Sequence, residues 1–269
     1  MISDLVPDRA VEGVFAVKTK RRLRTRAGAP YLLLELVDSS GRIDARVWND
    51  VELLDGRFAE GDAVRVLGRV ERFRDRLQLD VRTLEAADVD PATLTPSLRR
   101  DADELQGFLE FLVAEISHPE LATTVRAVLA GRDLAAFPAT PDDHHSYAGG
   151  LLEHTVGVAT LCLDTAALHP RLRPDLLLAA ALVHDVGRTL ELSAGPAFAA
   201  TEEGRLLGHV HLGLRLVEQH AGELDSGGRA ELLHCVACHH DARAARTAEA
   251  AVLYHVNQID ATAATRPAG

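Results

Sequence analysis

Residues 176–185 read LLLAAALVHD, an apolar run that ends in the adjacent polar pair His184 and Asp185. An apolar run of this length without alternation is typical of a buried helix. Polar atoms at the exit of a buried helix must find partners there. An imidazole nitrogen and a carboxylate that can bridge two ions are well suited to hold metal. This stretch therefore predicts a metal centre within a helical bundle.

Two more histidines and an aspartate lie on the apolar faces of other segments with helical spacing. His154 lies three residues after Leu151, and His209 lies three residues after Leu206. Asp260 follows on a later apolar segment, and aspartate is rarely buried without a partner. One histidine on an apolar face is usually an ordinary core residue, but several on successive helices favour metal ligation.

The composition is ordinary for a globular protein, since 47% of the 269 residues are apolar and 26% are charged. This length allows one large domain or two modest ones. The N-terminus lacks a basic segment followed by an apolar stretch, and no run of about 18 apolar residues occurs. Three cysteines are too few for a disulfide scaffold. We therefore expect a cytoplasmic protein that does not span a membrane.

The net charge of −11 is unevenly distributed along the chain. Residues 1–87 hold 16 Lys and Arg against 15 Asp and Glu, whereas the remainder holds 13 against 25. The basic residues of the first part gather in two runs, at 18–26 and 69–76. A single basic run is usually a solvated loop. Two runs in one small domain, opposite an acidic remainder, favour a polyanionic partner.

The first third of the chain alternates apolar and polar residues, which is typical of β-strands. Five short strands in about 85 residues fit a small closed barrel, and an OB-fold has that number of strands, with an SH3-like barrel as the alternative. The predicted strands are residues 11–18, 31–37, 42–48, 63–70 and 77–84.

Aromatic side chains of this first third are candidates for stacking on bases, with filling of the barrel core as the alternative. The candidates are Phe15, Tyr31, Trp48 and Phe73. Of these, we choose Trp48 and Phe73 as expected substrate contacts.

Residues 89–97 carry two prolines and no periodicity, which predicts a linker. The segments after it show apolar residues at three- and four-residue spacing, as in 103–116 and 120–130. We therefore predict a multidomain α+β protein, with a small β-barrel (OB-fold) at residues 1–88 and an all-α domain at residues 98–269.

Longer motifs surround the candidate ligands. In the second part they are HHSYAGGLLEHT at 144–155, HDVGRT at 184–189, EGRLLGH at 203–209, the pair at 239–240 and IDA at 259–261. In the first part they are GAPYL at 28–32 and GDAVRVLG at 61–68. Over nearly the whole chain, these motifs resemble the HD superfamily of metal-dependent phosphohydrolases. Within it, they resemble the YhaM-type 3′→5′ exoribonucleases, which join an OB-fold to an HD domain.

The resemblance implies a dinuclear centre in which Asp185 bridges two divalent ions, Mn²⁺ first, with Mg²⁺, Fe²⁺ or Co²⁺ as alternatives. It implies that a metal-bridged hydroxide attacks the last phosphodiester at the 3′ end of single-stranded RNA, or of single-stranded DNA, and releases nucleoside 5′-monophosphates. Asp185 and Arg188 are then the catalytic residues. The implied metal ligands are His154, His184, Asp185, His209, His239 and Asp260.

The resemblance also implies substrate contacts near the metal centre. Helical spacing leaves the choice between His239 and His240 open, since either can face inward, and we favour His239 as the ligand. His144 and His145 precede a Gly-Gly turn, with a structural role in that loop as the alternative. The expected substrate contacts are His144, His145, Tyr147 and His240, together with Trp48 and Phe73 of the barrel.

The chain departs from the family pattern at three places. Arg188 stands where the family usually has lysine, and arginine keeps the charge and can bind phosphate bidentately. Residues 241–246 replace a glycine and a Gly-Ser-Pro loop, and Asn257 replaces a common aspartate. Two other functions therefore stay open: a nucleotide or cyclic-nucleotide phosphohydrolase, and a nucleic-acid-binding protein with an inactive HD domain. The expected partner is single-stranded RNA or DNA, and a homo-oligomer is left open.

Overall fold

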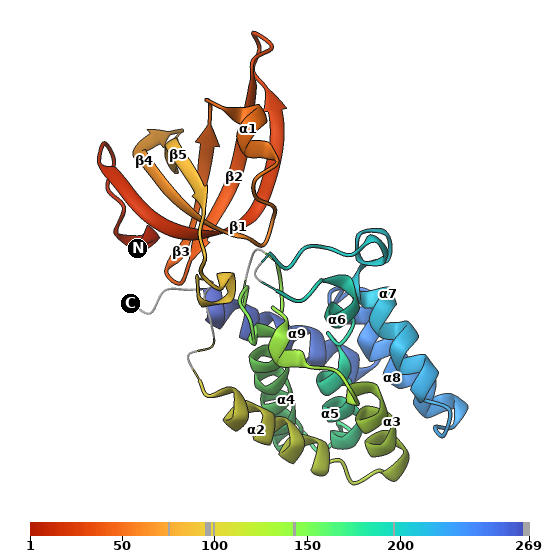
Figure 1. The fold of residues 1–269 in the computed structure, drawn as a ribbon. Helices are drawn as coiled ribbons and strands as arrows, with labels where there is room; N and C mark the ends of the chain where they lie inside the picture. Colours follow the sequence, from red (N-terminus) through yellow and green to blue (C-terminus); the bar gives the residue numbers. More distant parts are fainter. Residues whose placement is uncertain (75, 95–97, 99, 142–143, 196, 266–269) are drawn as a thin grey trace. The chain divides into compact units, whose positions relative to one another are not determined.

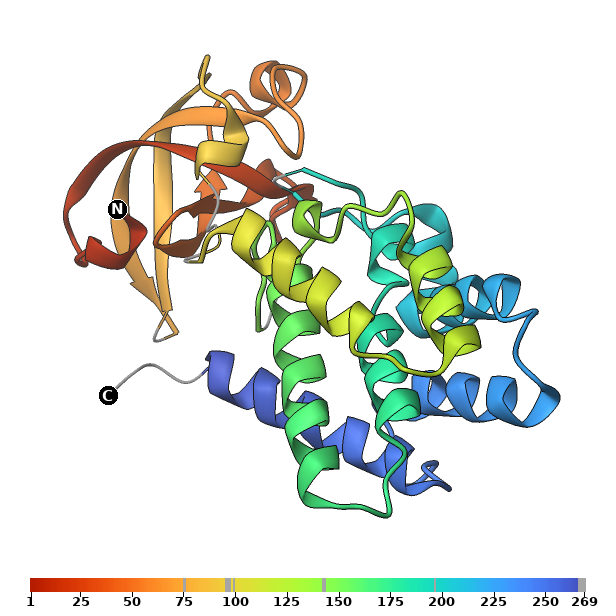
Figure 2. The same ribbon diagram turned by 90° about the horizontal axis from the view of Figure 1, so that it is seen from below.

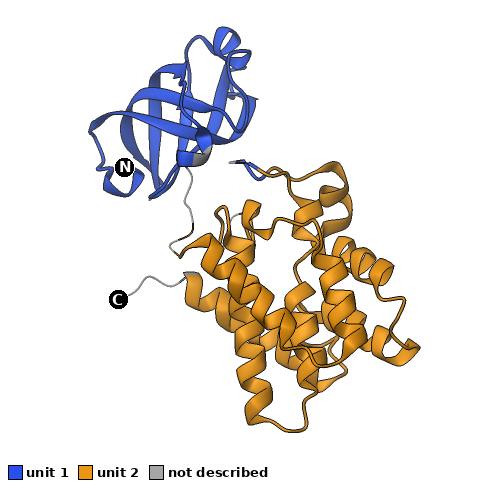
Figure 3. Ribbon diagram, turned by 60° about the horizontal axis from the view of Figure 1, so that its bottom comes forward, with its two compact units in different colours: residues 1–97, 195–198 blue, residues 98–194, 199–269 orange. Residues whose placement is uncertain are grey.

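A computed structural model describes residues 1–74, 76–94, 98, 100–141, 144–195 and 197–265. The chain divides into two compact units, which are residues 1–97 with 195–198 and residues 98–194 with 199–269 (Figure 3). Each unit has a hydrophobic core of its own, the first built from strands and the second from helices. The predicted multidomain α+β class, a small β-barrel followed by a helical domain, is confirmed.

The first unit is a closed five-stranded barrel (Figure 1). Its strands are β1 Ala10–Arg24, β2 Pro30–Asp38, β3 Gly41–Val47, β4 Ala63–Phe73 and β5 Arg76–Ala86. They pair in the order β1-β2-β3-β5-β4, and β4 pairs back to β1. β3 and β5 run parallel, whereas the other neighbours run antiparallel. Two short helices accompany the strands, η1 Ile2–Asp4 before β1 and α1 Val51–Asp55 between β3 and β4. A small five-stranded barrel of this kind is the predicted OB-fold.

Alternating side chains fill the barrel. On β2, Leu32, Leu34 and Leu36 are fully buried, because every second residue of a strand points to the same face. β1 continues beyond its predicted end to Arg24, which pairs with Pro30 of β2. Most of the basic run at 18–26 is therefore strand, and its arginines are exposed.

The predicted linker at 89–97 is described only in part, since residues 95–97 lie outside the described residues. Residues Pro91–Leu94 form a 3₁₀ helix, η2, that contacts β1. The start of this segment therefore belongs to the barrel unit.

The second unit is helical (Figure 2). Its helices are α2 Ala102–Ala114, α3 Pro119–Leu129, α4 Gly150–Leu168, α5 Pro174–Val183, α6 Arg188–Glu191, α7 Glu202–His220, α8 Ser226–Cys238 and α9 Ala248–Thr265, with a 3₁₀ helix η3 Leu134–Ala136. α5 lies at the centre, where α2, α3, α4, α8 and α9 all contact it. Residues 176–183 are buried without exception, which explains why this helix is apolar on every side.

Helix α4 is the one helix among the described residues that is long and apolar enough to cross a membrane, judged by length and composition. Half of that stretch is buried inside the protein. Its residues Leu152 and Val158 belong to the same core as α5. Packing in a core accounts for this composition.

Truncation of a buried leucine should show that each unit has its own core. We expect Leu34→Ala to destabilise the barrel and Leu182→Ala to destabilise the helical unit, each by about 2–5 kcal/mol, because each leaves a cavity. Leu53→Ala is the control, since Leu53 is 56% exposed on α1. It should change the free energy of unfolding by less than about 0.5 kcal/mol.

Urea unfolding followed by two signals measures these effects. The single tryptophan lies in the barrel, so its fluorescence reports that unit, and far-ultraviolet circular dichroism reports the helices. An equal loss of unfolding free energy in all three variants would contradict the assignment of these cores.

Candidate metal centre

Side chains from several helices converge beyond the C-terminal end of α5. They are His154 on α4, His184 and Asp185 after α5, His209 on α7, His239 and His240 after α8, and Asp260 on α9. His184 and His239 are fully buried, and Asp185 is only 2% exposed. The structure thus brings the residues predicted as ligands into one region of the second unit.

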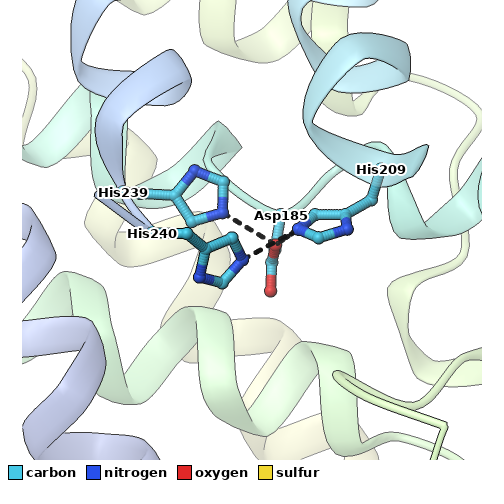
Figure 4. Close-up of side chains that lie close together, drawn as sticks. All are labelled: Asp185, His209, His239 and His240. Carbon is cyan, nitrogen blue, oxygen red and sulfur yellow. Dashed lines mark hydrogen bonds and ion pairs between the residues drawn. The ribbon is translucent and has the colours of Figure 1, made fainter. Parts of the chain in front are cut away.

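The carboxylate of Asp185 divides the histidines into two sets. Its Oδ1 lies 3.3 Å from Nε2 of His209 and 3.3 Å from Nε2 of His239 (Figure 4). Its Oδ2 lies 3.8 Å from Nε2 of His154 and 3.7 Å from Nε2 of His184. Each oxygen therefore faces its own pair of imidazoles. A carboxylate with ligands on both sides is suited to bridge two cations.

Three groups among the described residues have a ligand set that could hold a metal ion. We call the first the His209 group, which comprises Asp185, His209, His239 and His240. We call the second the His184 group, which comprises His154, His184 and Asp185. The third joins His145, His154 and Asp260. In each group the ligand atoms lie within 4.8 Å of one another.

Contacts on the Nδ1 side fix the orientation of three of these rings. Nδ1 of His184 donates to the main-chain carbonyl three residues earlier at 2.7 Å, and Nδ1 of His239 does the same at 2.6 Å. Nδ1 of His154 lies 2.6 Å from Oδ2 of Asp260. A neutral imidazole protonated at Nδ1 carries a lone pair at Nε2. In its neutral form, each ring therefore turns an unprotonated nitrogen toward Asp185.

The atoms that meet around Asp185 have no proton to share. Nε2 of His154 and Nε2 of His184 are 3.2 Å apart. Oδ1 of Asp185 and Nε2 of His239 are buried without a hydrogen-bond partner among the described residues. Facing lone pairs repel each other, and buried polar atoms without partners are costly. Divalent cations between these atoms would remove both penalties, so the residues fit a metal centre.

Both members of the pair after α8 reach the His209 group. His239 lies against Asp185, whereas Nε2 of His240 lies 2.9 Å from Nε2 of His209. His240 is the more exposed of the pair. Helical spacing could not separate the two, because α8 ends immediately before them.

Burial governs the protonation of this centre. It lowers the pKa of His184 to about 3. Partial burial beside His239 also lowers the pKa of His240 to about 3, although its side chain is exposed at one side, so both rings are neutral near pH 7. Burial alone would raise the pKa of Asp185, but the guanidinium of Arg188 beside it helps to hold that pKa well below its usual range. Neutral imidazoles and an ionised carboxylate are the forms that bind metal.

Arg188 and Glu191, on the one-turn helix α6, lie against the His209 group. Arg188 is 8% exposed, and its Nε lies 3.9 Å from Oδ1 of Asp185. Its Nη1 donates to Oε2 of Glu191 at 2.6 Å. Burial alone would raise the pKa of Glu191, but contacts with His209 and Arg188 outweigh it, so the pKa of Glu191 is lower than usual. Sequence reasoning missed Glu191, and the available signal was its position three residues after Arg188, where helical side chains meet.

We expected His209 to face the core because it lies three residues after Leu206, and that reason is wrong. Leu206, which the spacing placed on the same buried face, is 71% exposed. α7 is interrupted at Gly208, where φ is +71°, so helical spacing does not continue from Leu206 to His209.

Close contact between α6 and α7 requires Gly187, because a Cβ there would lie 2.0 Å from the carbonyl oxygen of His209.

One of the predicted substrate contacts in the loop before α4, His145, lies directly against Asp260. Nε2 of His145 lies 3.0 Å from Oδ2 of Asp260, and its Nδ1 lies 2.8 Å from the hydroxyl of Tyr147. The ring of His144 lies 5.1 Å from the ring of His154. Asp260 thus contacts His154 on its Nδ1 side, within the third group.

The barrel exposes the two aromatic side chains that were chosen as substrate contacts. Trp48 is 41% exposed and Phe73 is 45% exposed, whereas Phe15 fills the core. Tyr31 stacks on Trp48 with ring centroids 4.9 Å apart. The guanidinium of Arg46 lies 4.9 Å from the ring centre of Phe73 and 5.9 Å from that of Trp48. We call Tyr31, Arg46, Trp48 and Phe73 the aromatic surface. Exposed rings beside a cation suit single-stranded nucleic acid.

Acid should destabilise the metal-free protein well above the pKa of ordinary carboxylates. His184 and His240 have an ordinary pKa of 6.5 when unfolded and a pKa of about 3 when folded. The unfolded chain therefore binds more protons between these values, and stability present above pH 6.5 is lost as the pH falls through this window. We expect the urea midpoint in EDTA to fall steadily from about pH 6.5 toward about pH 4.

The variant His240→Gln removes one of the two titrating rings and should reduce this pH slope. A urea midpoint that stays constant across the same interval would contradict the lowered pKa values of His184 and His240.

Comparisons with known proteins match both units. A family model described as HD domain matches residues 151–262, and one described as OB-fold nucleic acid binding domain matches residues 14–87. A further model, described as a helicase, matches residues 109–170. Among solved structures, the second OB-fold domain of replication protein A from Methanococcus maripaludis is 26% identical with a TM-score of 0.28, covering 33% of this chain and 94% of that chain.

Curated relatives match most of the chain. The 3′-5′ exoribonuclease YhaM of Oceanobacillus iheyensis is 29% identical over 237 residues, which cover 85% of this chain and 75% of the relative. The protein of the same name from Halalkalibacterium halodurans is 29% identical over 94% of this chain and 83% of its own. That of Bacillus subtilis is 28% identical over 93% of this chain and 84% of its own. The chain therefore combines an OB-fold barrel with a helical unit that matches the HD domain model, and it resembles the YhaM 3′-5′ exoribonucleases over most of its length.

Proposed function

We propose that this protein is a metal-dependent 3′→5′ exoribonuclease that hydrolyses single-stranded RNA to nucleoside 5′-monophosphates, with single-stranded DNA as the alternative substrate. The HD domain and relatives named exoribonucleases support a metal-dependent nuclease. The proposal rests above all on Asp185, whose two carboxylate oxygens face two separate pairs of imidazoles. A centre with this geometry is suited to phosphodiester hydrolysis.

The residues present would hold two divalent ions, Mn²⁺ in our proposal. His154 and His184 would hold one, His209 and His239 would hold the other, and Asp185 would be shared. Such ions lower the pKa of water and neutralise phosphate oxygens. The main-chain carbonyls that accept from Nδ1 of His184 and of His239 keep the opposite nitrogens free for ligation.

Arg188 would supply a fixed positive charge for the incoming phosphate. Its guanidinium lies beside Asp185 and is held by Glu191, so its charge stays near the metal centre. Arginine keeps the charge of the lysine that is usual in the family, and it can bind phosphate through two nitrogens. We therefore keep Arg188 with Asp185 as the proposed catalytic pair.

The loop before α4 would complete the site. His144, His145 and Tyr147 remain our proposed substrate contacts, and His240 would line the same side as His209. Asp260 supports the centre through Nδ1 of His154 in this structure, and its direct ligation of metal remains a prediction.

The barrel would hold the RNA strand. An OB-fold domain supports binding of single-stranded nucleic acid. The aromatic surface offers Trp48 and Phe73 for stacking on bases, and exposed arginines of β1, such as Arg21 and Arg24, would attract phosphates. A cytoplasmic location remains a prediction, and a homo-oligomeric state remains open.

Removal of the bridging carboxylate should abolish RNA hydrolysis. We expect metal-loaded protein to shorten 5′-labelled single-stranded RNA stepwise from its 3′ end, and Asp185→Asn to lower the rate by about 100-fold or more, because both ions lose a shared ligand. EDTA should have the same effect. Asp164→Asn, an exposed position on α4, is the matched control and should keep the wild-type rate.

Gel analysis of the products separates the proposal from its rivals, with labelled DNA run alongside. Intact RNA together with hydrolysed nucleotides would identify a nucleotide phosphohydrolase. Bound RNA without hydrolysis of either substrate would identify a binding protein with an inactive HD domain.

Loss of one exposed ring should weaken RNA binding without affecting the metal centre. We expect Trp48→Ala to raise the Kd for single-stranded RNA by about 5- to 150-fold, because one stacked base is lost. Trp48→Phe should restore most of the affinity, and Leu53→Ala should not change it. Fluorescence anisotropy measures the Kd, and an unchanged Kd for Trp48→Ala would place RNA binding elsewhere.

A further inference from the structure

One metal-site histidine, His209, is held differently from the others. It follows Gly208, whose φ of +71° and ψ of 160° interrupt α7. The main-chain N–H of His209 donates to Oε1 of Glu191 at 3.2 Å. A side-chain carboxylate thus accepts a donor that a continuous helix would satisfy with its own carbonyl.

The second oxygen of the same carboxylate meets two more groups. Oε2 of Glu191 lies 3.5 Å from Nδ1 of His209 and accepts from Nη1 of Arg188 at 2.6 Å. The Glu191 side chain is only 15% exposed. One carboxylate therefore joins the main chain of His209, its ring and the guanidinium of Arg188.

The backbone of Glu191 is itself fixed against α7. Its carbonyl accepts from the N–H of Thr201 at 2.9 Å, next to the hydroxyl of Thr201, which donates to the carbonyl of Leu190 at 2.8 Å. A Cβ at Gly204 would lie 2.1 Å from the Glu191 carbonyl oxygen, so a glycine is required for this approach. The carboxylate is therefore built into the contact between α6 and α7.

This contact has a chemical consequence for His209. A carboxylate beside Nδ1 favours the tautomer that is protonated there, which leaves a lone pair at Nε2. That Nε2 lies 3.3 Å from Oδ1 of Asp185 and 2.9 Å from Nε2 of His240. Glu191 thus lies on the Nδ1 side of His209, where His184 and His239 have main-chain carbonyls, although its contact of 3.5 Å is longer than theirs.

We infer that Glu191 is a positioning residue that turns Nε2 of His209 toward Asp185 and holds Arg188 beside it, so that cation binding by the His209 group depends on Glu191 while binding by the His184 group does not. The inference deepens the proposed function and rests on its two-ion centre. It can nevertheless be tested without metal or RNA, because it concerns the orientation and tautomer of the His209 ring.

The test compares the full-length protein with Glu191→Gln, which keeps an amide oxygen for the N–H of His209 but removes the negative charge. Glu203→Gln is the matched control, because Glu203 is an exposed carboxylate on α7 that pairs with Arg215. Equilibrium dialysis against Mn²⁺ with elemental analysis counts bound ions. We expect the weaker-binding ion of Glu191→Gln to lose about 10- to 100-fold in affinity, with the other ion retained and the control unchanged.

Two further readouts use signals other than activity. Electron paramagnetic resonance of the loaded protein should lose the signal of a coupled manganese pair in Glu191→Gln. In metal-free protein, ¹⁵N spectra of the imidazoles should show His209 protonated at Nδ1 in the wild type and mixed tautomers in the variant. If Glu191→Gln does not fold by circular dichroism, Glu191→Asp, which keeps the charge and withdraws it from the ring, should show the same losses.

Unchanged affinity for both ions together with an unchanged His209 tautomer would overturn the positioning role. Failure of the proposed function looks different, because the wild type itself would then bind one ion or none, or would leave RNA intact. The tautomer of His209 in metal-free protein still decides the role of Glu191 in that case.

Discussion

The buried carboxylate of Asp185 is the constraint on which the rest of the helical unit depends. It is 2% exposed, and an ionised carboxylate is costly to bury unless opposite charges or donors surround it. Arg188 supplies one positive charge at 3.9 Å, but His184 and His239 turn unprotonated nitrogens toward the same carboxylate. Bound cations would complete the compensation, so we expect metal binding and the stability of this centre to be linked.

The helices supply the ligands through their ends. α5 can place the pair His184 and Asp185 at the centre because its other side chains are apolar and buried. His184 and His239 directly follow helices, so their Nδ1 atoms reach carbonyls that a helix end leaves without partners. His209 lies within an interrupted helix and uses the carboxylate of Glu191 instead. Each ring is thus oriented by a group outside the metal site, and that orientation directs Nε2 inward.

Local periodicity made part of this structure predictable. The barrel strands and α5 follow from alternation and from an unbroken apolar run, because both patterns report which side chains are buried. The extension of β1 to Arg24 does not follow from these patterns. It depends on pairing with β2, and it places exposed arginines on a strand. The position of His209 depends on the interruption at Gly208, and Glu191 depends on the contact between α6 and α7. Helical spacing can pair Glu191 with Arg188, but local sequence carries no signal of the contact between Glu191 and α7.

The central claim is that the two oxygens of Asp185 bridge two divalent ions. Anomalous X-ray scattering from crystals of the full chain loaded with Mn²⁺ locates such ions directly. We expect two peaks, one between Oδ1 of Asp185 and the pair His209 and His239, and one between Oδ2 and the pair His154 and His184. A single peak, or peaks that do not contact Asp185, would contradict it.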